Sequence, residues 1–348
     1  MGITNQEYFF LFLASFIFVG FLTPLMRKIA IAKDVVDRPN SPHKSHKKPV
    51  PYLGGVAIII GIVSITYASS LISDFTAGTF WLASSVLAPA LILGIIGLID
   101  DIKNLSPWPR FLAQSFAAMF TGVVLILSDN FGNPTGSRVF DMAISLIWIV
   151  GICNSINFFD NLDGGAAGTV AISSFGLALL SILSNQYLIT AMSVVTLGSM
   201  LGFLVWNKNP ARIYMGDAGA LFLGILISVL TIRLRPSTST HVASFATPIL
   251  LLAVPIMDTS VAVISRVSRN ISPFQGGQDH LSHRIMSRNI NRRKTAYLLW
   301  ILSSYFCAIA IFMNISKTNE LKILSLGAIS WLSVFLLFFG KNFRISKN

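Results

Sequence analysis

Eleven apolar stretches, each about long enough to cross a lipid bilayer, constrain this chain more than any other feature. A bilayer core of ~30 Å needs about 20 apolar residues per helix. Only 11% of the 348 residues are charged, whereas soluble domains carry roughly 25%. We therefore predict an all-α polytopic integral membrane protein that forms a single domain over residues 1–348. The predicted spans are residues 7–26, 53–73, 79–99, 111–128, 141–159, 166–184, 187–206, 219–235, 246–265, 295–315 and 320–340.

The positions of lysine and arginine predict the orientation of these spans. If residues 27–52 lie in the cytoplasm, 21 of the 26 basic residues fall on the inner side, as the positive-inside rule requires. The N-terminus is then outside and the C-terminus is cytoplasmic. The net charge of +12 follows from this topology and from attraction to anionic lipids, so no nucleic-acid partner is needed. The predicted cytoplasmic loops are residues 27–52, 100–110, 160–165, 207–218 and 266–294.

The acidic residues gather on the same inner side. Nine of the 14 face the cytoplasm, and seven of these lie at or just inside helix ends. A carboxylate held in hydrocarbon costs ~2.5–3.5 kcal/mol, so such residues indicate function. A hard divalent cation, together with basic residues, would balance their charge, and oxygen ligands near phosphate suit Mg²⁺. The seven are Asp100, Asp101, Asp160, Asp163, Asp217, Asp258 and Asp279.

Three motifs place these acids near helix ends. Asp100 and Asp101 close an apolar run, where an acidic end of a span is the simpler alternative. Asn154, Asn157 and Asp160 recur at i, i+3 and i+6 and share one helical face; hydrogen bonding between helices is the alternative for the asparagines. Asp217 lies next to Gly216 near the expected start of a helix, where capping alone would explain one aspartate.

The histidines of the long inner loop form another cluster. His280 and His283 share a face if that segment is helical, with Arg284 adjacent. A zinc site is one interpretation, but no third strong ligand is near, so binding of phosphate or sugar hydroxyls is preferred. Asp258 lies about eight residues inside the ninth predicted span, and the sequence identifies no partner for it. Lys48 belongs to a basic loop that either grips phosphate or only signals topology.

Together these motifs resemble the polyprenyl-phosphate N-acetylhexosamine-1-phosphate transferases, which form glycosyltransferase family 4. The resemblance spans roughly residues 38–294. The final motif departs from the triple histidine of the MurNAc-pentapeptide branch, so the chain is more similar to the WecA- and TagO-type enzymes. The segments that carry the resemblance are PVPYLGGVAI, GLIDDIKN, NSINFFDNLDGG, MGDAGALFLG and DHLSHR.

The resemblance implies an activity and a set of site residues. The enzyme would move GlcNAc-1-phosphate, or another HexNAc-1-phosphate, from a UDP-sugar to undecaprenyl phosphate and release UMP. The site would face the cytoplasm from the bacterial inner membrane and start a lipid-linked cell-envelope glycan. Asn157 and Asp217 would hold Mg²⁺, with Mn²⁺ as the alternative metal. The catalytic residues would be Asp100, Asp101, Asp160 and Asp163, and the substrate-binding residues Asn154, Lys48, His280, His283 and Arg284.

Two positions depart from the family pattern, and one rival function remains. Asn104 stands where the DDxxD-type motif of the family has its third acid. In the Asn-x-x-Asp-Gly-x-Asp-Gly segment, Asn161 stands where the family has the first glycine. A cation-coupled transporter would also place acids in a membrane, but such sites lie near the midplane of repeated halves. Here the acids lie at one surface and no repeat is visible. The sequence leaves a homodimer open.

Overall fold

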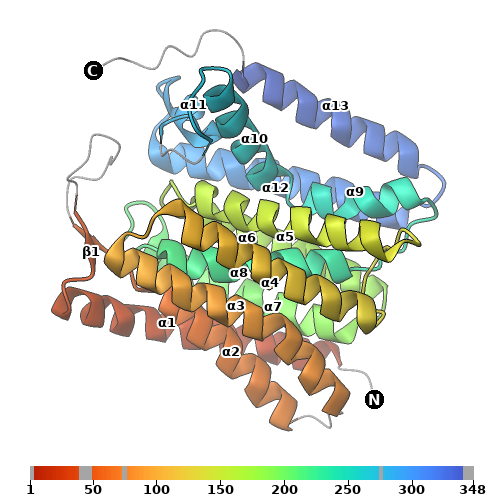
Figure 1. Ribbon diagram of the computed structural model, residues 1–348, viewed down its shortest axis with the longest axis horizontal. Helices are drawn as coiled ribbons and strands as arrows, with labels where there is room; N and C mark the ends of the chain where they lie inside the picture. The colour runs from red at the N-terminus through yellow and green to blue at the C-terminus, as the bar shows by residue number, and fades with distance from the viewer. Residues whose placement is uncertain (1–3, 39–48, 73–76, 274–276, 340–348) are drawn as a thin grey trace.

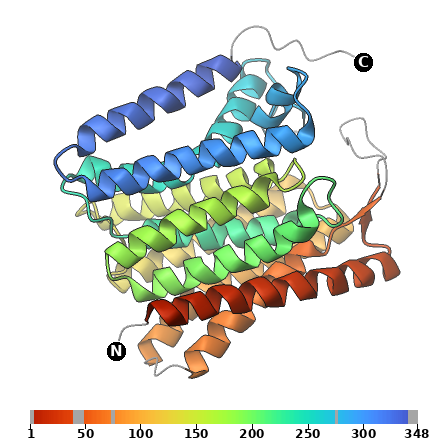
Figure 2. The ribbon, with the colours of Figure 1, turned by 180° about the vertical axis from the view of Figure 1, so that it is seen from behind.

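The described residues form a bundle of thirteen helices and one short β-ladder (Figure 1). The structure is a computed structural model and describes residues 4–38, 49–72, 77–273 and 277–339. Most of the long helices run along a common direction, as the view from behind also shows (Figure 2). The elements are α1 (Asn5–Ala32), β1 (Val36–Asp37), β2 (Val50–Pro51), α2 (Gly54–Ile72), α3 (Ala77–Lys103), α4 (Pro107–Leu127), α5 (Arg138–Phe159), α6 (Gly165–Leu183), α7 (Tyr187–Asn207), α8 (Gly216–Arg233), α9 (His241–Leu251), α10 (Ala253–Val267), α11 (Leu281–Met286), α12 (Arg292–Ile315) and α13 (Glu320–Phe339).

Ten of the eleven predicted apolar stretches each correspond to one helix, and the short helix α11 lies in a predicted loop. Within the described residues, nine helices are long and apolar enough to cross a membrane, and the apolar segment of α2 is somewhat shorter. The ninth stretch corresponds to the pair α9 and α10. The prediction of an all-α polytopic membrane protein is confirmed. The start of α1 and the end of α13 lie at opposite ends of the bundle (Figure 1).

The prediction of one continuous ninth span is wrong, because the helix breaks at Leu252. The axes of α9 and α10 differ by 76°. Pro255 has no N–H to offer the carbonyl of Leu251, and its ring would clash with that carbonyl in a continuous helix. The freed carbonyl instead accepts a hydrogen bond from Ser173 Oγ at 2.7 Å. The neighbouring helix α6 thus supplies the hydrogen bond that the carbonyl of Leu251 lost at the break. Non-helical backbone at membrane depth requires such a partner.

Several predicted inner loops are too long, because helices continue past the first charged residue. The third helix includes Asp100 and Asp101 and ends only at Lys103, and α4 already begins at Pro107. The backbone N–H of Asn104 still donates to the carbonyl of Asp100 at 2.7 Å, and Asn104 then takes a positive φ of 50°. Hydropathy marks where the apolar run ends, whereas hydrogen bonding and left-handed residues mark where the helix ends.

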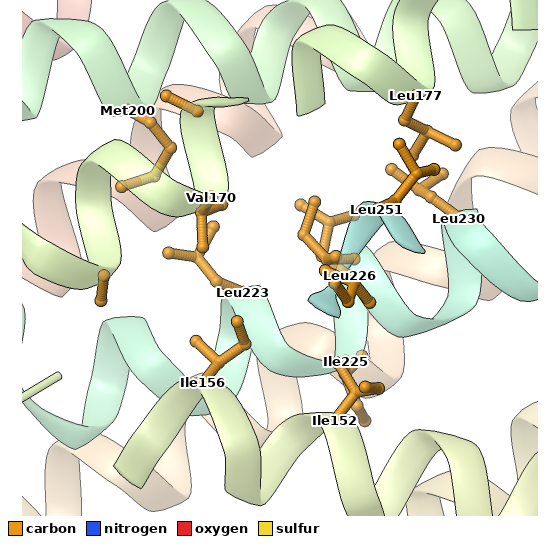
Figure 3. Close-up of a cluster of buried hydrophobic side chains, with 14 of the residues drawn as sticks. Ile152, Ile156, Val170, Leu177, Met200, Leu223, Ile225, Leu226, Leu230 and Leu251 are labelled. Carbon is orange, nitrogen blue, oxygen red and sulfur yellow. The ribbon is translucent and has the colours of Figure 1, made fainter. Parts of the chain in front are cut away.

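Helix α8 lies at the centre of the bundle. Every residue from Ala218 to Arg233 is buried, and α3, α5 and α2 pack around it. Side chains of α5, α6, α7 and α9 meet those of α8 in one apolar cluster (Figure 3). By contrast, α1, α4 and α13 expose many large apolar side chains, as helices that face lipid do. The first turn of α8 carries Asp217, so the core of the bundle positions this residue.

Candidate active site

A cavity of about 470 Å³ opens at the end of the bundle that carries β1 and α11. Residues from segments far apart in the sequence line it, and six of them are aspartates. Five of the seven aspartates singled out by the sequence line this cavity together with Asp37, whereas Asp258 and Asp279 do not. The lining residues are Asp37, Tyr52, Asp100, Asp101, Asn104, Leu105, Arg110, Asn157, Asp160, Asn161, Leu162, Asp163, Tyr214, Gly216, Asp217, Gly277, His280, His283 and Arg292.

Asp217 is the centre of a polar cluster that joins four helices. Its Oδ1 accepts a hydrogen bond from Asn157 Nδ2 at 2.8 Å, and its Oδ2 pairs with Arg110 Nη1 at 2.5 Å. The same Arg110 atom lies 2.5 Å from Asp100 Oδ2, and Asp100 Oδ1 accepts the N–H of Leu105. One guanidinium thus holds together two carboxylates that would otherwise repel each other. The predicted metal pair, Asn157 and Asp217, is in direct contact.

Asp101 binds backbone rather than a side chain. Its two carboxylate oxygens accept the N–H groups of Asp217 at 2.8 Å and Ala218 at 3.1 Å. These are orphan donors at the start of α8, so Asp101 caps this helix from α3. Gly216 leaves room for the carboxylate: its φ is +70°, and a Cβ there would lie 2.5 Å from Asp101 Oδ2. The positive end of α8 is therefore neutralised by the protein itself.

The PVPYLGG segment positions the start of α8. The N–H of Gly54 donates to the carbonyl of Tyr214 at 3.0 Å, and that of Gly55 donates to the carbonyl of Met215 at 2.8 Å. A Cβ on Gly55 would lie 2.2 Å from the backbone nitrogen of Gly219. Glycines at this contact allow α2 and α8 to approach backbone to backbone. The motif thus shapes the site without contributing a charge.

The two acids that follow α5 have different surroundings. Asp163 is buried, and its Oδ2 accepts hydrogen bonds from Asn209 Nδ2 at 2.8 Å and from Ala211 N at 3.1 Å. It therefore fixes the loop that leads to α8. Asp160 lies in the turn after α5 and lines the cavity. Burial, and then the charge of Asp217, raise the pKa of Asp160, so a cation nearby would favour its charged form.

Asp258 and His280 form a buried pair, in which His280 lines the cavity and Asp258 lies behind it. His280 Nδ1 lies 2.7 Å from Asp258 Oδ2, and Leu281 N donates to Asp258 Oδ1 at 2.8 Å. On the other side of the ring, Arg266 Nη2 lies 3.2 Å from His280 Nε2. An arginine can only donate, so this contact places the His280 proton on Nδ1, facing Asp258. Arg266 also binds Asp279 Oδ2 at 3.1 Å.

This arrangement answers two questions that the sequence left open. Asp258 is the partner that holds His280, which explains an acid inside an apolar helix. Both ring nitrogens of His280 are engaged, so this histidine offers no free lone pair to a zinc ion. Within the described part of the chain, no three His, Cys, Asp or Glu side chains are grouped as a metal site. The zinc interpretation therefore gains no support.

Of the other predicted substrate-binding residues, the structure places His283 at the cavity and Arg284 and Asn154 away from it. His283 lines the cavity, and burial, then the nearby His280, lower the pKa of His283 to about 4. Arg284 is buried away from the cavity and donates to the carbonyls of Asp279 and Phe338. Asn154 lies one turn deeper in α5 than Asn157, and its Nδ2 donates to Gln114 Oε1 on α4 at 2.6 Å. Lys48 lies outside the described residues.

Two arginines that line the cavity were not assigned to the site by sequence reasoning. Arg110 is the shared partner of Asp100 and Asp217, and Arg292 begins α12. Both fall in predicted inner loops, where basic residues already serve as topology signals. The one available clue was the excess of acids at the same surface, which requires cations to balance it.

The donor set around Asp217 fits Mg²⁺. Proteins bind this ion through one or two carboxylates, and the substrate phosphates and water supply the other oxygens. Asp217 brings one carboxylate, and Asn157 brings an amide whose oxygen and nitrogen exchange places by a simple rotation. In this structure Arg110 supplies the positive charge beside Asp217.

Comparison with known proteins decides the family. The model of glycosyl transferase family 4 matches residues 83–235. A probable undecaprenyl-phosphate N-acetylglucosaminyl 1-phosphate transferase of Bacillus subtilis is 32% identical over 332 residues, which cover 94% of this chain and 87% of the relative. The chain belongs to glycosyl transferase family 4. The resemblance inferred from the motifs is thereby confirmed.

Two further relatives agree with this placement. Decaprenyl-phosphate N-acetylglucosaminephosphotransferase of Mycobacterium tuberculosis H37Rv is 29% identical over 359 residues, covering 94% of this chain and 88% of the relative. Phospho-N-acetylmuramoyl-pentapeptide-transferase of Streptococcus mutans is 28% identical, but over only 54% of this chain and 60% of the relative. The matched family segment contains Asp100, Asp101, Asn157, Asp160 and Asp217 and ends before the His280 loop.

Proposed function

We propose that this family 4 member transfers N-acetylglucosamine 1-phosphate from UDP-N-acetylglucosamine to undecaprenyl phosphate and releases UMP. An oxygen of the lipid phosphate attacks the sugar-linked phosphorus, and the bond from that phosphorus to the UMP oxygen breaks. The observation that carries the proposal is the acidic cavity around Asp217, in a chain 32% identical to a B. subtilis protein named for this activity. The site faces the cytoplasm from the bacterial inner membrane, where the nucleotide sugar is available.

The chemistry requires two anions to meet, so the protein must position them and balance their charge. Asp217 and Asn157 would hold Mg²⁺, with Mn²⁺ as a substitute. When bound, the ion supplies positive charge to the diphosphate and its leaving UMP. Arg110 provides the protein's own cation beside Asp217 and can shift toward phosphate oxygens, for which arginine offers a matching fork of donors.

Asp100 is the better candidate to orient the lipid phosphate. Both acids line the cavity, but Asp100 shares the side chain of Arg110 with Asp217, whereas both oxygens of Asp101 cap the backbone of α8. The second pKa of a phosphate monoester is ~6, so the attacking oxygen is largely deprotonated at neutral pH without a strong base. Asp160 adds negative charge that favours cation binding. Asp163 and Asp101 act by holding the loop and helix that present Asp217.

A direct assay tests the proposal. Protein purified in detergent is incubated with undecaprenyl phosphate and each member of a UDP-sugar panel, and UMP release and labelled lipid product are measured. We expect product with UDP-N-acetylglucosamine, complete dependence on Mg²⁺ or Mn²⁺, and no UMP without the lipid phosphate. Product formation that persists in excess EDTA would remove the metal from the proposal. No product with any UDP-sugar, together with ion-driven uptake in liposomes, would favour the transporter alternative, which family membership does not support.

A further inference from the structure

Arg292 is a cation that lines the cavity and has no partner among the residues that the structure describes. It is the first residue of α12 and lines the cavity. Across residues 4–38, 49–72, 77–273 and 277–339, its guanidinium makes no hydrogen bond and no ion pair. Its Nε is shielded from solvent and also lacks a partner. A buried polar atom without a partner is energetically unfavourable, so the arrangement calls for a ligand.

The carboxylates of the cavity do not supply that ligand. Arg110 holds Asp100 and Asp217, and the start of α8 holds Asp101. Asp163 is bound by Asn209 and by the backbone of Ala211. Arg292 thus stays unpaired by any described residue in a cavity lined by six aspartates, and it is positioned for an anion that arrives from outside.

His283 points to the same ligand chemistry. It lines the cavity beside Arg292, and its buried Nδ1 has no hydrogen-bond partner among the residues that the structure describes. The charge of Arg292 acts on both His283 and Tyr214, so these three side chains lie in one part of the cavity. An unpaired guanidinium suits the oxygens of a phosphate group, and the neutral ring of His283 has one N–H that can donate to them.

We propose that Arg292, assisted by His283, binds a phosphate group of a substrate on the α12 side of the cavity. This inference rests on the proposed function, because it assigns a second phosphate contact to the site around Asp217. Two substrates carry such a group: the diphosphate of the UDP-sugar and the phosphate monoester of the polyprenyl lipid. The experiment below distinguishes them. A planar guanidinium can bind two phosphate oxygens at once, which lysine cannot.

Adjacent arginines provide the kinetic test. Arg292→Gln removes the cavity cation, Arg292→Lys retains the charge without the fork, and Arg293→Gln is the matched control. Arg293 is exposed, and its Nε donates to Tyr297 Oη at 3.1 Å. We expect Arg292→Gln to raise the KM of one substrate at least ~10-fold, Arg292→Lys to raise it less, and Arg293→Gln to change neither KM by more than about twofold. The substrate whose KM rises identifies the phosphate; unchanged KM values for both substrates would overturn the proposal.

A binding measurement separates this proposal from the transferase activity. Thermal midpoints are recorded with UDP, with farnesyl phosphate and with inorganic phosphate at matched ionic strength. We expect UDP or farnesyl phosphate to stabilise the wild type and the Arg293→Gln protein, and to stabilise Arg292→Gln markedly less. If the wild type binds UDP in this way but forms no lipid product, the proposed reaction fails and the phosphate site stands. Equal stabilisation of Arg292→Gln and wild type by both probes would refute the phosphate site.

Discussion

Gly97→Ala tests whether the packing of α3 against α8 sets the position of Asp217. Gly97 lies one turn before Asp100 and Asp101, and a Cβ built there would lie 2.3 Å from the backbone oxygen of Asp217. Ordinary contact begins at 3.4 Å, so the two backbones must separate by about 1.1 Å. A displacement of about 1 Å at a reacting centre costs roughly 100-fold in rate. Overpacking of this kind also destabilises by about 1–3 kcal/mol.

The assay compares Gly97→Ala with Gly151→Ala, a matched change in α5. A Cβ on Gly151 meets nothing within 4 Å, so this substitution only replaces glycine by a better helix former. We expect UMP release by Gly97→Ala to fall about 100-fold and its thermal midpoint to fall by several degrees. Gly151→Ala should retain both properties. Full turnover in Gly97→Ala would show that Asp217 tolerates displacement, and the argument from helix packing would be wrong.

Three further substitutions probe the cavity. Asp217→Asn keeps the shape of the side chain but removes the charge that Arg110 and a cation require. Turnover should fall at least ~100-fold, while the protein still inserts and purifies normally. Near-wild-type turnover would exclude Asp217 from the metal site. Asp258→Asn weakens the buried bond to His280 Nδ1, so the thermal midpoint and turnover should both fall, and a variant equal to wild type in both would contradict the positioning role. The lowered pKa of His283, about 4 against an ordinary 6.5, means that the unfolded chain binds a proton first as the pH falls. Stability should therefore drop from about pH 6.5 toward pH 4, and less so in His283→Gln, as measured by thermal midpoints across this range; parallel curves would be evidence against a buried, neutral His283.

Hydropathy and charge sufficed to predict most of the architecture. A membrane helix must satisfy its backbone internally, so a long apolar run leaves few alternatives to a helix. Hydropathy did not predict the break at Leu252, because the surrounding segment is apolar throughout. Pro255 was visible in the sequence, but only the fold shows that Ser173 accommodates the freed carbonyl of Leu251. The C-terminal end of α3 and the start of α8 were predicted too close to the apolar run, because charged residues can continue a helix at the membrane surface.

The acids of the site could be predicted because placing a carboxylate in a membrane costs free energy, so acids near apolar helices are rare and indicate function. Their individual roles could not, since a capping aspartate such as Asp101 and a cavity aspartate such as Asp100 are adjacent and chemically identical. The arginines could not be assigned to the site from the sequence. Basic residues are common in inner loops, so Arg110 could not be distinguished from a topology signal. Partner identity depends on contacts between distant segments, such as Asp258 with His280, which spacing alone does not reveal.

The burial of α8 has a consequence for how the protein responds to its bilayer. Membranes that are too thick or too thin tilt helices and deform the lipid around them, and such forces act on the surfaces that touch lipid. Most of α13 is open to that environment, whereas α8 is enclosed by other helices along its whole length. The helix that presents Asp217 is therefore shielded from direct contact with lipid, and a change of membrane thickness reaches Asp217 only through neighbouring helices such as α4, which carries Arg110.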